Sequence, residues 1–398
     1  MRKEKRMNKN WEVRKLGDIA EVIAGQSPKG IYYNKERVGL PFYQGKKEFT
    51  DKYIGAPSTW TTNVTREAYK DDILMSVRAP VGPVNFSTQT ICIGRGLAVI
   101  RAGNILNKEF LFYFLIKHES EIEQSQGAVF NSINKKQIES ITIPLPPLSE
   151  QHRIVSILDQ SFAAIDQAIS RTQRNLNNAK EIFESYLNRV FEEKGEDWEE
   201  KKLEGITSKI GSGATPRGGQ ANYKTEGISM IRSMNIHDLK FEERNLAFID
   251  DKQASNLNNV ILQQYDVLIN ITGASIARCC VLPEEYLPAR VNQHVSIIRP
   301  LRNIVDPYFL SHLLVSKAYK KKLLDIGNKG ATRQAITKAE IEKFKISFPN
   351  LVKQQLIVEK LESLQVETQR LEAIYRQKLK SLKELKKSML EMAFRGEL

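Results

Sequence analysis

Two long stretches of the chain carry an uninterrupted helical pattern of apolar residues. Within 148–191, apolar or near-apolar positions recur in steps of four and three from 158 to 190, and the same alternation runs over 361–392 with Lys378 as its one charged member. Such alternation is the heptad seam of a coiled coil. We therefore predict two long helices with the seam residues Leu158, Phe162, Ile165, Ile169, Leu176, Phe183, Leu361, Leu364, Leu371, Tyr375, Leu382, Leu385 and Met389.

The segments that lead into these helices also repeat. The sequence IESITIPLPPLSEQ at 138–151 corresponds to IEKFKISFPNLVKQ at 341–354, and Phe191 corresponds to Phe394, all at an offset of 203 residues. Farther upstream, WEVRKLGDI at 11–19 corresponds to WEEKKLEGI at 198–206, at an offset of 187. The chain is therefore an internal duplication whose second half carries about sixteen more residues, spread over loops.

Strand-like segments with polar ends repeat between these landmarks. DILMSVR at 72–78 corresponds to DVLINIT at 266–272, and an amphipathic helix is predicted later in each half, around 110–122 and 309–324. The glycines and prolines of GQSPKG at 25–30 and GATPRG at 213–218 indicate loops that take unusual angles or approach another segment closely.

The polar clusters between the repeated segments differ from one half to the other. QGKK at 44–47 corresponds to RSMN at 232–235, and GRG at 94–96 corresponds to NQH at 292–294. A repeated scaffold with different polar residues on the same loops suggests two related binding sites that recognise two different targets. Ordinary loop divergence after duplication is the alternative.

Composition narrows the class of protein. The 398 residues suffice for two domains, and no run of about 18 apolar residues predicts a transmembrane helix. The first ten residues are basic and lack the apolar stretch of a signal peptide, so we predict a disordered tail. Three cysteines, two of them adjacent, do not suggest a disulfide framework, and we expect a cytoplasmic protein. The net charge of +13 fits either a nucleic-acid partner or a merely basic soluble protein.

The sequence lacks the motifs that would predict an enzyme. It contains no phosphate-binding loop, no HExxH motif, no cysteine pair at zinc spacing and no nucleophile elbow. The sequence DPYF at 306–309 resembles the Asp-Pro-Pro-Tyr motif of DNA amino-methyltransferases but lacks its second proline, and it fits a helix N-cap better. We expect no catalytic residue, no metal and no bound cofactor on this chain.

In contrast to enzyme motifs, side chains of the types that contact DNA are frequent in the repeated loops. Arg, Lys, Asn and Gln read base edges, and Lys, Ser and Thr often hold phosphates. The basic run at 320–322 is more typical of a solvated helix face. The predicted DNA-binding residues are Gln44, Lys46, Lys47, Arg66, Arg78, Arg95, Arg232, Asn235, Asn270, Arg278, Asn292, Gln293, Lys329 and Arg333.

From residue 11 to residue 398 the chain resembles the specificity subunit, HsdS, of Type I restriction-modification systems. The resemblance rests on the WExxxLGDI opening, on IPLPPLxEQxxI at 143–154, on the two long helices and on MAFRGEL at 392–398, where many relatives have Thr or Ser in place of Arg395. It implies an α/β (α+β), pseudo-twofold protein with two similar target recognition domains separated by two long antiparallel coiled-coil helices. The predicted segments are a basic tail (1–10), recognition domain 1 (11–147), spacer helix 1 (148–194), recognition domain 2 (195–350) and spacer helix 2 (351–398).

The resemblance also implies a function. Each recognition domain would read one half of a bipartite, asymmetric double-stranded DNA target, and the helices would set the spacer and dock two methyltransferase subunits. Restriction subunits would join through the complex, with S-adenosylmethionine, ATP and Mg on the partner subunits. The 33 residues from Leu158 to Val190 span roughly 50 Å, against about 34–36 Å between half-sites one DNA turn apart. The alternative is a non-catalytic coiled-coil scaffold with non-specific DNA binding.

Overall fold

The computed structural model describes residues 11–125, 132–215, 222–328 and 335–398. It divides into two compact units, one made of Met1–Gln173 with Gln377–Leu398 and the other of Arg174–Arg376. Each unit therefore joins a predicted recognition domain to one half of each predicted spacer helix, because the helix ends pack into the domain cores. The predicted basic tail lies outside the described residues. None of the helices in the described part of the chain is long and apolar enough to cross a membrane.

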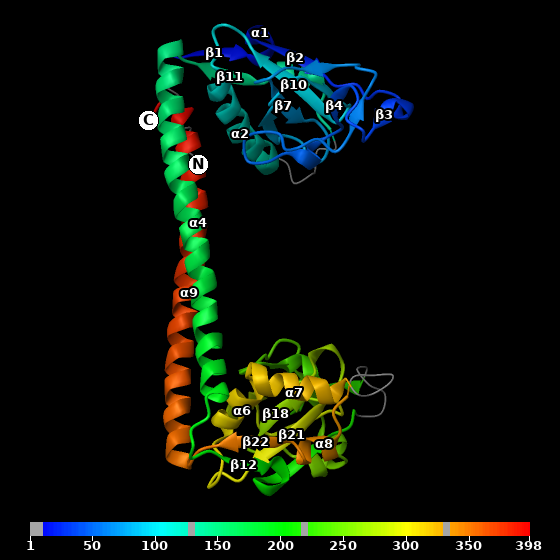
Figure 1. The fold of residues 1–398 in the computed structure, drawn as a ribbon, viewed down its shortest axis with the longest axis vertical. Helices are drawn as coiled ribbons and strands as arrows, with labels where there is room; N and C mark the ends of the chain where they lie inside the picture. Colours follow the sequence, from blue (N-terminus) through cyan, green and yellow to red (C-terminus); the bar gives the residue numbers. More distant parts are fainter. Residues whose placement is uncertain (1–10, 126–131, 216–221, 329–334) are drawn as a thin grey trace. The chain divides into compact units, whose positions relative to one another are not determined.

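The first unit is built on two small sheets. One is antiparallel in the order β2-β10-β7-β8, and the other has the order β3-β5-β4-β9-β6 with β4 and β9 parallel. Figure 1 labels β2, β10 and β7 of the first sheet and β3 and β4 of the second. Helix α2 packs on β8 and β10, and a ladder of β1 with β11 brings the opening segment beside the start of α4. The elements are β1 (Glu12–Lys15), α1 (Leu16–Ile19), β2 (Ala20–Ala24), β3 (Tyr33–Asn34), β4 (Leu40–Tyr43), β5 (Trp60–Thr61), β6 (Glu67–Ala68), β7 (Ile73–Ser76), β8 (Val84–Phe86), β9 (Ile91–Ile93), β10 (Leu97–Ala102), α2 (Lys108–Ser125), α3 (Lys135–Glu139), β11 (Thr142–Leu145) and α4 (Leu148–Glu192).

The second unit repeats this order, which confirms a mixed helix-and-sheet fold with two similar domains. Its antiparallel sheet has the order β13-β21-β18-β19, β14 and β20 are parallel, and β12 pairs with β22. The elements are β12 (Glu199–Lys202), β13 (Thr207–Ser212), β14 (Ile228–Ile231), β15 (Ile236–His237), β16 (Lys240–Phe241), β17 (Ala247–Ile249), α5 (Asp251–Ser255), β18 (Val267–Asn270), β19 (Cys279–Val281), β20 (Ala289–Val291), β21 (Val295–Pro300), α6 (Pro307–Val315), α7 (Lys317–Gly327), α8 (Lys338–Glu342), β22 (Lys345–Phe348) and α9 (Leu351–Ala393).

The helix expected around 309–324 is two helices, α6 and α7, separated at Ser316. The backbone of Ser316 is extended, with φ −59° and ψ 146°. The Lys317 N–H donates to Asn188 Oδ1 of α4 at 2.8 Å, so a side chain from the long helix caps α7. At the start of α6, Asp306 Oδ1 accepts from the N–H groups of Tyr308 and Phe309, which confirms the N-cap interpretation of this motif.

An ion pair between a buried aspartate and a half-buried arginine stands at the same place in each unit. Arg101 donates through Nε and Nη2 to the two carboxylate oxygens of Asp72, at 2.9 and 2.7 Å. Arg299 makes the same pair of bonds to Asp266, at 2.7 and 2.8 Å. Bidentate bonds between charged groups are strong and directional. They tie β10 to the turn before β7, and β21 to the turn before β18, which explains why these residues repeat in the sequence.

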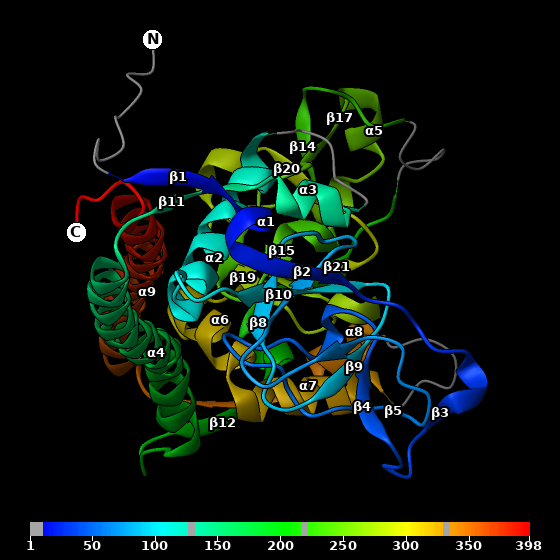
Figure 2. The same cartoon turned by 90° about the horizontal axis from the view of Figure 1, so that it is seen from above.

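In each unit one half of α4 and one half of α9 lie side by side (Figure 1 and Figure 2). In the first unit, Lys386 Nζ lies 2.8 Å from Asp166 Oδ1, and Arg153 donates to the carbonyl oxygen of Leu398 at 2.8 Å. Residue numbers rise along α4 as they fall along α9, so the two helix halves run antiparallel.

The predicted seam is wrong at Leu385, which is 48% exposed. Its place is taken by Lys386, whose ammonium group lies 4.7 Å from the centroid of the Phe162 ring. The half-buried positions Tyr375 and Leu379 are four residues apart where the heptad predicts a step of three, so the register of α9 slips by one residue. The other predicted seam residues are buried or half-buried.

A buried glutamine docks the start of each long helix. Gln354, which is fully buried, accepts from the Asp306 N–H at 2.8 Å and donates to the carbonyl oxygens of Ile304 and Pro349 at 3.0 and 2.8 Å. Gln151 makes the equivalent three bonds in the first unit. The glutamine therefore repeats because it joins the helix to the domain that precedes it.

An aromatic residue docks the end of each long helix. Phe191, at the end of α4, packs against Phe309 of α6 with 5.4 Å between ring centroids. Phe394, just beyond the end of α9, packs against Phe110 and Phe114 of α2 at 5.0 and 5.4 Å. The end of α9 thus has the place in the first unit that the end of α4 has in the second, which explains the offset of 203 residues.

Candidate nucleic-acid interface

Three loops of the first unit converge on the three-residue loop between β9 and β10, residues 94–96. The Gly25 N–H after β2 donates to the Leu97 carbonyl at 3.0 Å, and the Gly96 N–H donates to the Gln44 carbonyl after β4 at 3.2 Å. The Val77 N–H after β7 donates to the Gly96 carbonyl at 3.0 Å. Loops that are distant in sequence are therefore held together by backbone bonds, whatever side chains they carry.

The second unit builds the same junction around the β20–β21 loop, residues 292–294. The Gly213 N–H after β13 donates to the Asn292 carbonyl at 3.2 Å, and the Asn292 N–H donates to the Ile231 carbonyl after β14 at 3.1 Å. The Ile271 N–H after β18 donates to the His294 carbonyl at 3.0 Å, as Val77 does to Gly96. The Asn292 bond also has its counterpart in the first unit, where the Gly94 N–H donates to the Tyr43 carbonyl at 2.8 Å. The two junctions therefore share two backbone bonds and differ in the third, because Gly25 bonds the first residue of β10 and Gly213 bonds the first residue of the loop.

Glycine is required where the first of these loops crosses the junction. A Cβ on Gly25 would lie 2.2 Å from the Gly94 carbonyl oxygen, and a Cβ on Gly213 would lie 1.7 Å from the Val291 carbonyl oxygen. Any other residue would push the loops apart. This is the close approach that the glycines at the start of the segments 25–30 and 213–218 predict.

Three predicted residues of the first unit line one hollow at this junction: Gln44, Lys47 and Arg95. Ser27 links two of them, because its hydroxyl donates to Gln44 Oε1 at 2.8 Å and accepts from the Arg95 N–H at 3.1 Å. Tyr33, which lines the same hollow, stacks on Phe42 with 4.7 Å between centroids, and burial raises the pKa of its hydroxyl. The hollow combines cationic, amide and aromatic groups.

The remaining predicted residues of the first unit lie around this hollow or apart from it. Lys46 is exposed, next to Lys47 on a single 3₁₀ turn, and Arg78 is exposed on the loop after β7. Arg66 lines a different hollow, which runs along β2 and includes Tyr69. Arg66 is therefore not gathered with the others.

In the second unit, Gln293 is exposed at the tip of the β20–β21 loop. Arg232 is half-buried, stacks over the Tyr223 ring at 5.2 Å and donates to the carbonyl oxygen of Asn245. Arg278, just before β19, is also half-buried. Lys329 and Arg333 lie outside the described residues.

Three predicted asparagines are turned inward, and the structure corrects their role. Asn235 and Asn270 are fully buried and Asn292 is 4% exposed. Their side chains bond the backbone: Asn235 donates to the carbonyl of Glu242, Asn270 donates to the carbonyl of Ser233, and Asn292 accepts from the N–H of His294. They hold the loops in shape and do not face outward.

Hydroxyl and imidazole groups that are not among the predicted residues complete the second junction. Thr215 occupies the position of Ser27 and donates to Gln293 Oε1. His294 Nε2 lies 3.2 Å from Gln293 Nε2, and His294 Nδ1 lies 2.6 Å from Thr272 Oγ1. The hydroxyl residue that repeats as Ser27 and Thr215 was the sequence signal that could have indicated these groups. Within the part of the chain that the structure describes, no three His, Cys, Asp or Glu side chains gather as a metal site would require.

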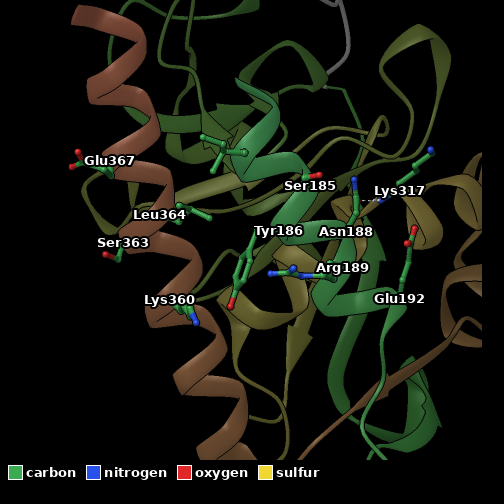
Figure 3. Close-up of a pocket in the computed structure, with 11 residues that line it drawn as sticks. Ser185, Tyr186, Asn188, Arg189, Glu192, Lys317, Lys360, Ser363, Leu364 and Glu367 are labelled. Atoms are coloured by element: carbon green, nitrogen blue, oxygen red, sulfur yellow. Dashed lines mark hydrogen bonds between the residues drawn. The ribbon is translucent and has the colours of Figure 1, made fainter. Parts of the chain in front are cut away.

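The helices of the second unit form a separate hollow between α4 and α9 (Figure 3). Tyr186 stands at its centre, with Lys360 Nζ and Arg189 Cζ each 5.4 Å from the ring centroid. Ile182 and Leu364 add apolar surface. The hollow combines an aromatic ring with basic side chains and with the carboxylates of Glu192 and Glu367.

Comparison with known proteins assigns the family. The model of the Type I restriction modification DNA specificity domain matches the chain twice, over 8–175 and 195–381. The putative type I restriction enzyme MjaX specificity subunit of Methanocaldococcus jannaschii is 42% identical over 187 residues, which cover 45% of this chain and 42% of that protein. The MjaVIII specificity subunit of the same organism is 25% identical over 410 residues, covering 99% and 94%.

A solved structure has the same fold along the whole chain. It comes from work described as the structural basis underlying complex assembly and conformational transition of the type I R-M system, and it matches with a TM-score of 0.76 at 19% identity, covering 99% of this chain and 100% of that one. Because the domain model matches both halves and most of the length, the chain belongs to the Type I restriction modification DNA specificity domain family.

Proposed function

We propose that this chain is the sequence-specific DNA-binding subunit of a Type I restriction-modification complex, in which each unit reads one half of a bipartite, asymmetric target. The observation that carries the proposal is the pair of equivalent loop junctions with unlike side chains. Gln44 and Arg95 in the first unit stand where Arg232 and Gln293 stand in the second. Base edges are read by such side chains, so the same framework would select two different sequences.

We infer that the chain recognises DNA while partner subunits carry out the chemistry. The relatives named above are specificity subunits, and the sequence offers no catalytic motif. Methyltransferase subunits would bind S-adenosylmethionine, and restriction subunits would bind ATP and Mg. The net charge of +13 favours association with the DNA backbone, which would be weakened by salt.

The long helices are the proposed docking surface for the methyltransferase subunits. On α9, the side chains of Val352, Leu356, Val366 and Ile374 are 50–66% exposed and fall on one side of the helix at 3.6 residues per turn. An apolar stripe of this kind is typical of a surface that a partner covers. The hollow around Tyr186 lies beside α9 in the same unit.

Exchange of one recognition domain tests the proposal. Residues 11–147 are replaced by the corresponding segment of another family member with a known target, and methylated adenines are mapped in cells that also express the methyltransferase subunit. One half of the methylated sequence should change and the other should stay. Exchange of residues 195–350 is the matched control and should change the other half.

A change in both halves would contradict independent reading by the two units. Methylation or binding without sequence preference would favour the alternative, a coiled-coil scaffold that binds DNA non-specifically. That alternative leaves the paired loop junctions without a role.

A further inference from the structure

The β9–β10 and β20–β21 loops differ at one outward position, which bears on the bases that each unit reads. Arg95 and Gln293 are the middle residues of these three-residue loops, and each lies two residues before the strand that follows. The Leu97 N–H closes the first loop on the Gly94 carbonyl at 3.0 Å, and the Val295 N–H closes the second on the Asn292 carbonyl at 3.3 Å. The two side chains are therefore presented from the same backbone position, and both are exposed.

The Arg95 guanidinium is available to a ligand. Within the described residues, no carboxylate lies within salt-bridge distance of it. Glu48, which lines the same hollow, accepts a hydrogen bond from the Ser58 hydroxyl at 2.9 Å. The Arg95 backbone is fixed by its bond to Ser27, so the side chain extends from an anchored point. A free guanidinium has two parallel N–H groups, which match the O6 and N7 acceptors on the major-groove edge of guanine.

The Gln293 side chain is held at both ends of its amide. Its Oε1 accepts from the Thr215 hydroxyl, and its Nε2 lies 3.2 Å from His294 Nε2. If the amide donates to His294 Nε2, the imidazole is neutral and its proton is on Nδ1, where Thr272 Oγ1 accepts it at 2.6 Å. These bonds use one amide N–H and one oxygen lone pair. One N–H and one lone pair remain, and N7 and the N6 amino group of adenine require that combination.

We propose that Arg95 reads a guanine in one half-site, that Gln293 reads an adenine at the corresponding position of the other, and that His294 is the positioning residue that orients the Gln293 amide. The inference rests on the proposed function and adds base identity to it. It assigns the asymmetry of the target, at this position, to a single pair of equivalent residues.

The test uses the methyltransferase complex reconstituted with the full chain and a set of duplexes, each with one base pair of the methylated motif changed. In the wild type, replacing the guanine or the adenine should weaken binding by about 5- to 150-fold. R95Q should change the preferred base from guanine to adenine in one half-site only, and Q293R should change adenine to guanine in the other. Lys47→Gln is the matched control. It removes a neighbouring charge and should weaken binding to all duplexes alike.

His294→Phe tests the positioning role, because it keeps a ring and removes the acceptor at Nε2. It should reduce the preference for adenine while binding to duplexes that already lack that adenine stays unchanged. Equal weakening on every duplex would overturn the positioning role.

The possible failures are distinguishable. If the wild type has a bipartite motif but R95Q and Q293R leave every base preference unchanged, the inference is wrong and the proposed function stands. If the wild type has no sequence preference, both are wrong. A variant that methylates no DNA in cells is still measured by its binding to the duplex set.

Discussion

Replacement of Gln354 by leucine should loosen the start of α9 from the domain that precedes it in the second unit. The side chain is fully buried and makes three hydrogen bonds, to the Asp306 N–H and to the carbonyl oxygens of Ile304 and Pro349. Leucine has nearly the same volume, so no large cavity forms and the change isolates the loss of polar partners. Asp306 is also the N-cap of α6, so the loss extends to that helix.

The expected cost follows from the groups left unpaired. Each buried polar group without a partner costs about 1 kcal/mol or more, so three such groups cost about 3 kcal/mol. That is a large part of the 5–15 kcal/mol that typically stabilises a folded protein. Gln355, the next residue along α9, is exposed, and its replacement by leucine should change the free energy of unfolding by less than about 0.5 kcal/mol.

Tryptophan fluorescence can follow the second unit alone. Trp198 packs against Phe309 at 5.9 Å between centroids, whereas Trp11 and Trp60 belong to the first unit and can be replaced by phenylalanine. Urea unfolding of this single-tryptophan chain should show a loss of about 3 kcal/mol for Q354L and almost none for Q355L. Equal effects of the two substitutions, or a loss below 1 kcal/mol for Q354L, would refute this account of helix docking.

Three further predictions concern the helices and two buried groups. Deleting 171–177 together with 374–380 shortens the helix pair by about 10 Å, so the spacer between half-sites should shrink by about three base pairs while both half-sequences stay. An unchanged spacer would exclude the idea that the helices set the distance between half-sites. Burial raises the pKa of the Cys280 thiol to about 12, so iodoacetamide at pH 8 should label it only after unfolding; rapid labelling of the folded chain would contradict this. Burial lowers the pKa of His312 below its ordinary 6.5, so the folded state binds this proton less readily than the unfolded chain does. Protonation of His312 therefore favours the unfolded chain, so the folded state keeps its full stability above pH 6.5 and loses part of it as the pH falls. The His312→Phe variant should lose less stability on acidification than the wild type, and equal acid sensitivity would disprove the assignment.

The repeated framework was predictable from the sequence because it depends on local pattern and on spacing. The offset of 203 residues pairs Gln151 with Gln354 and Phe191 with Phe394, and the structure gives each pair the same packing role. The cap at Asp306 follows from residue type and position alone. Periodicity located both long helices, since helical spacing of apolar residues is visible without any knowledge of their partners.

The outward face of the loops was not predictable in the same way. Asparagine bonds a loop backbone as readily as a base edge, and only the folded chain shows that Asn270 is buried. Gln293 is selected by residue type, but its link to Thr272 through His294 depends on loops that meet only in the folded unit. The exposure of Leu385 was likewise not predictable, because the seam position beside it is taken by Lys386, which lies over the ring of Phe162, far away in the sequence.

The central claim is that this chain determines a bipartite DNA sequence. Its most direct test is single-molecule methylome sequencing of cells that express the chain with its neighbouring methyltransferase subunit, compared with cells that lack the chain. We predict an asymmetric methyladenine motif in two parts that disappears when the chain is deleted. Methylation that is unaffected by the deletion, or that has no sequence preference, would contradict the account.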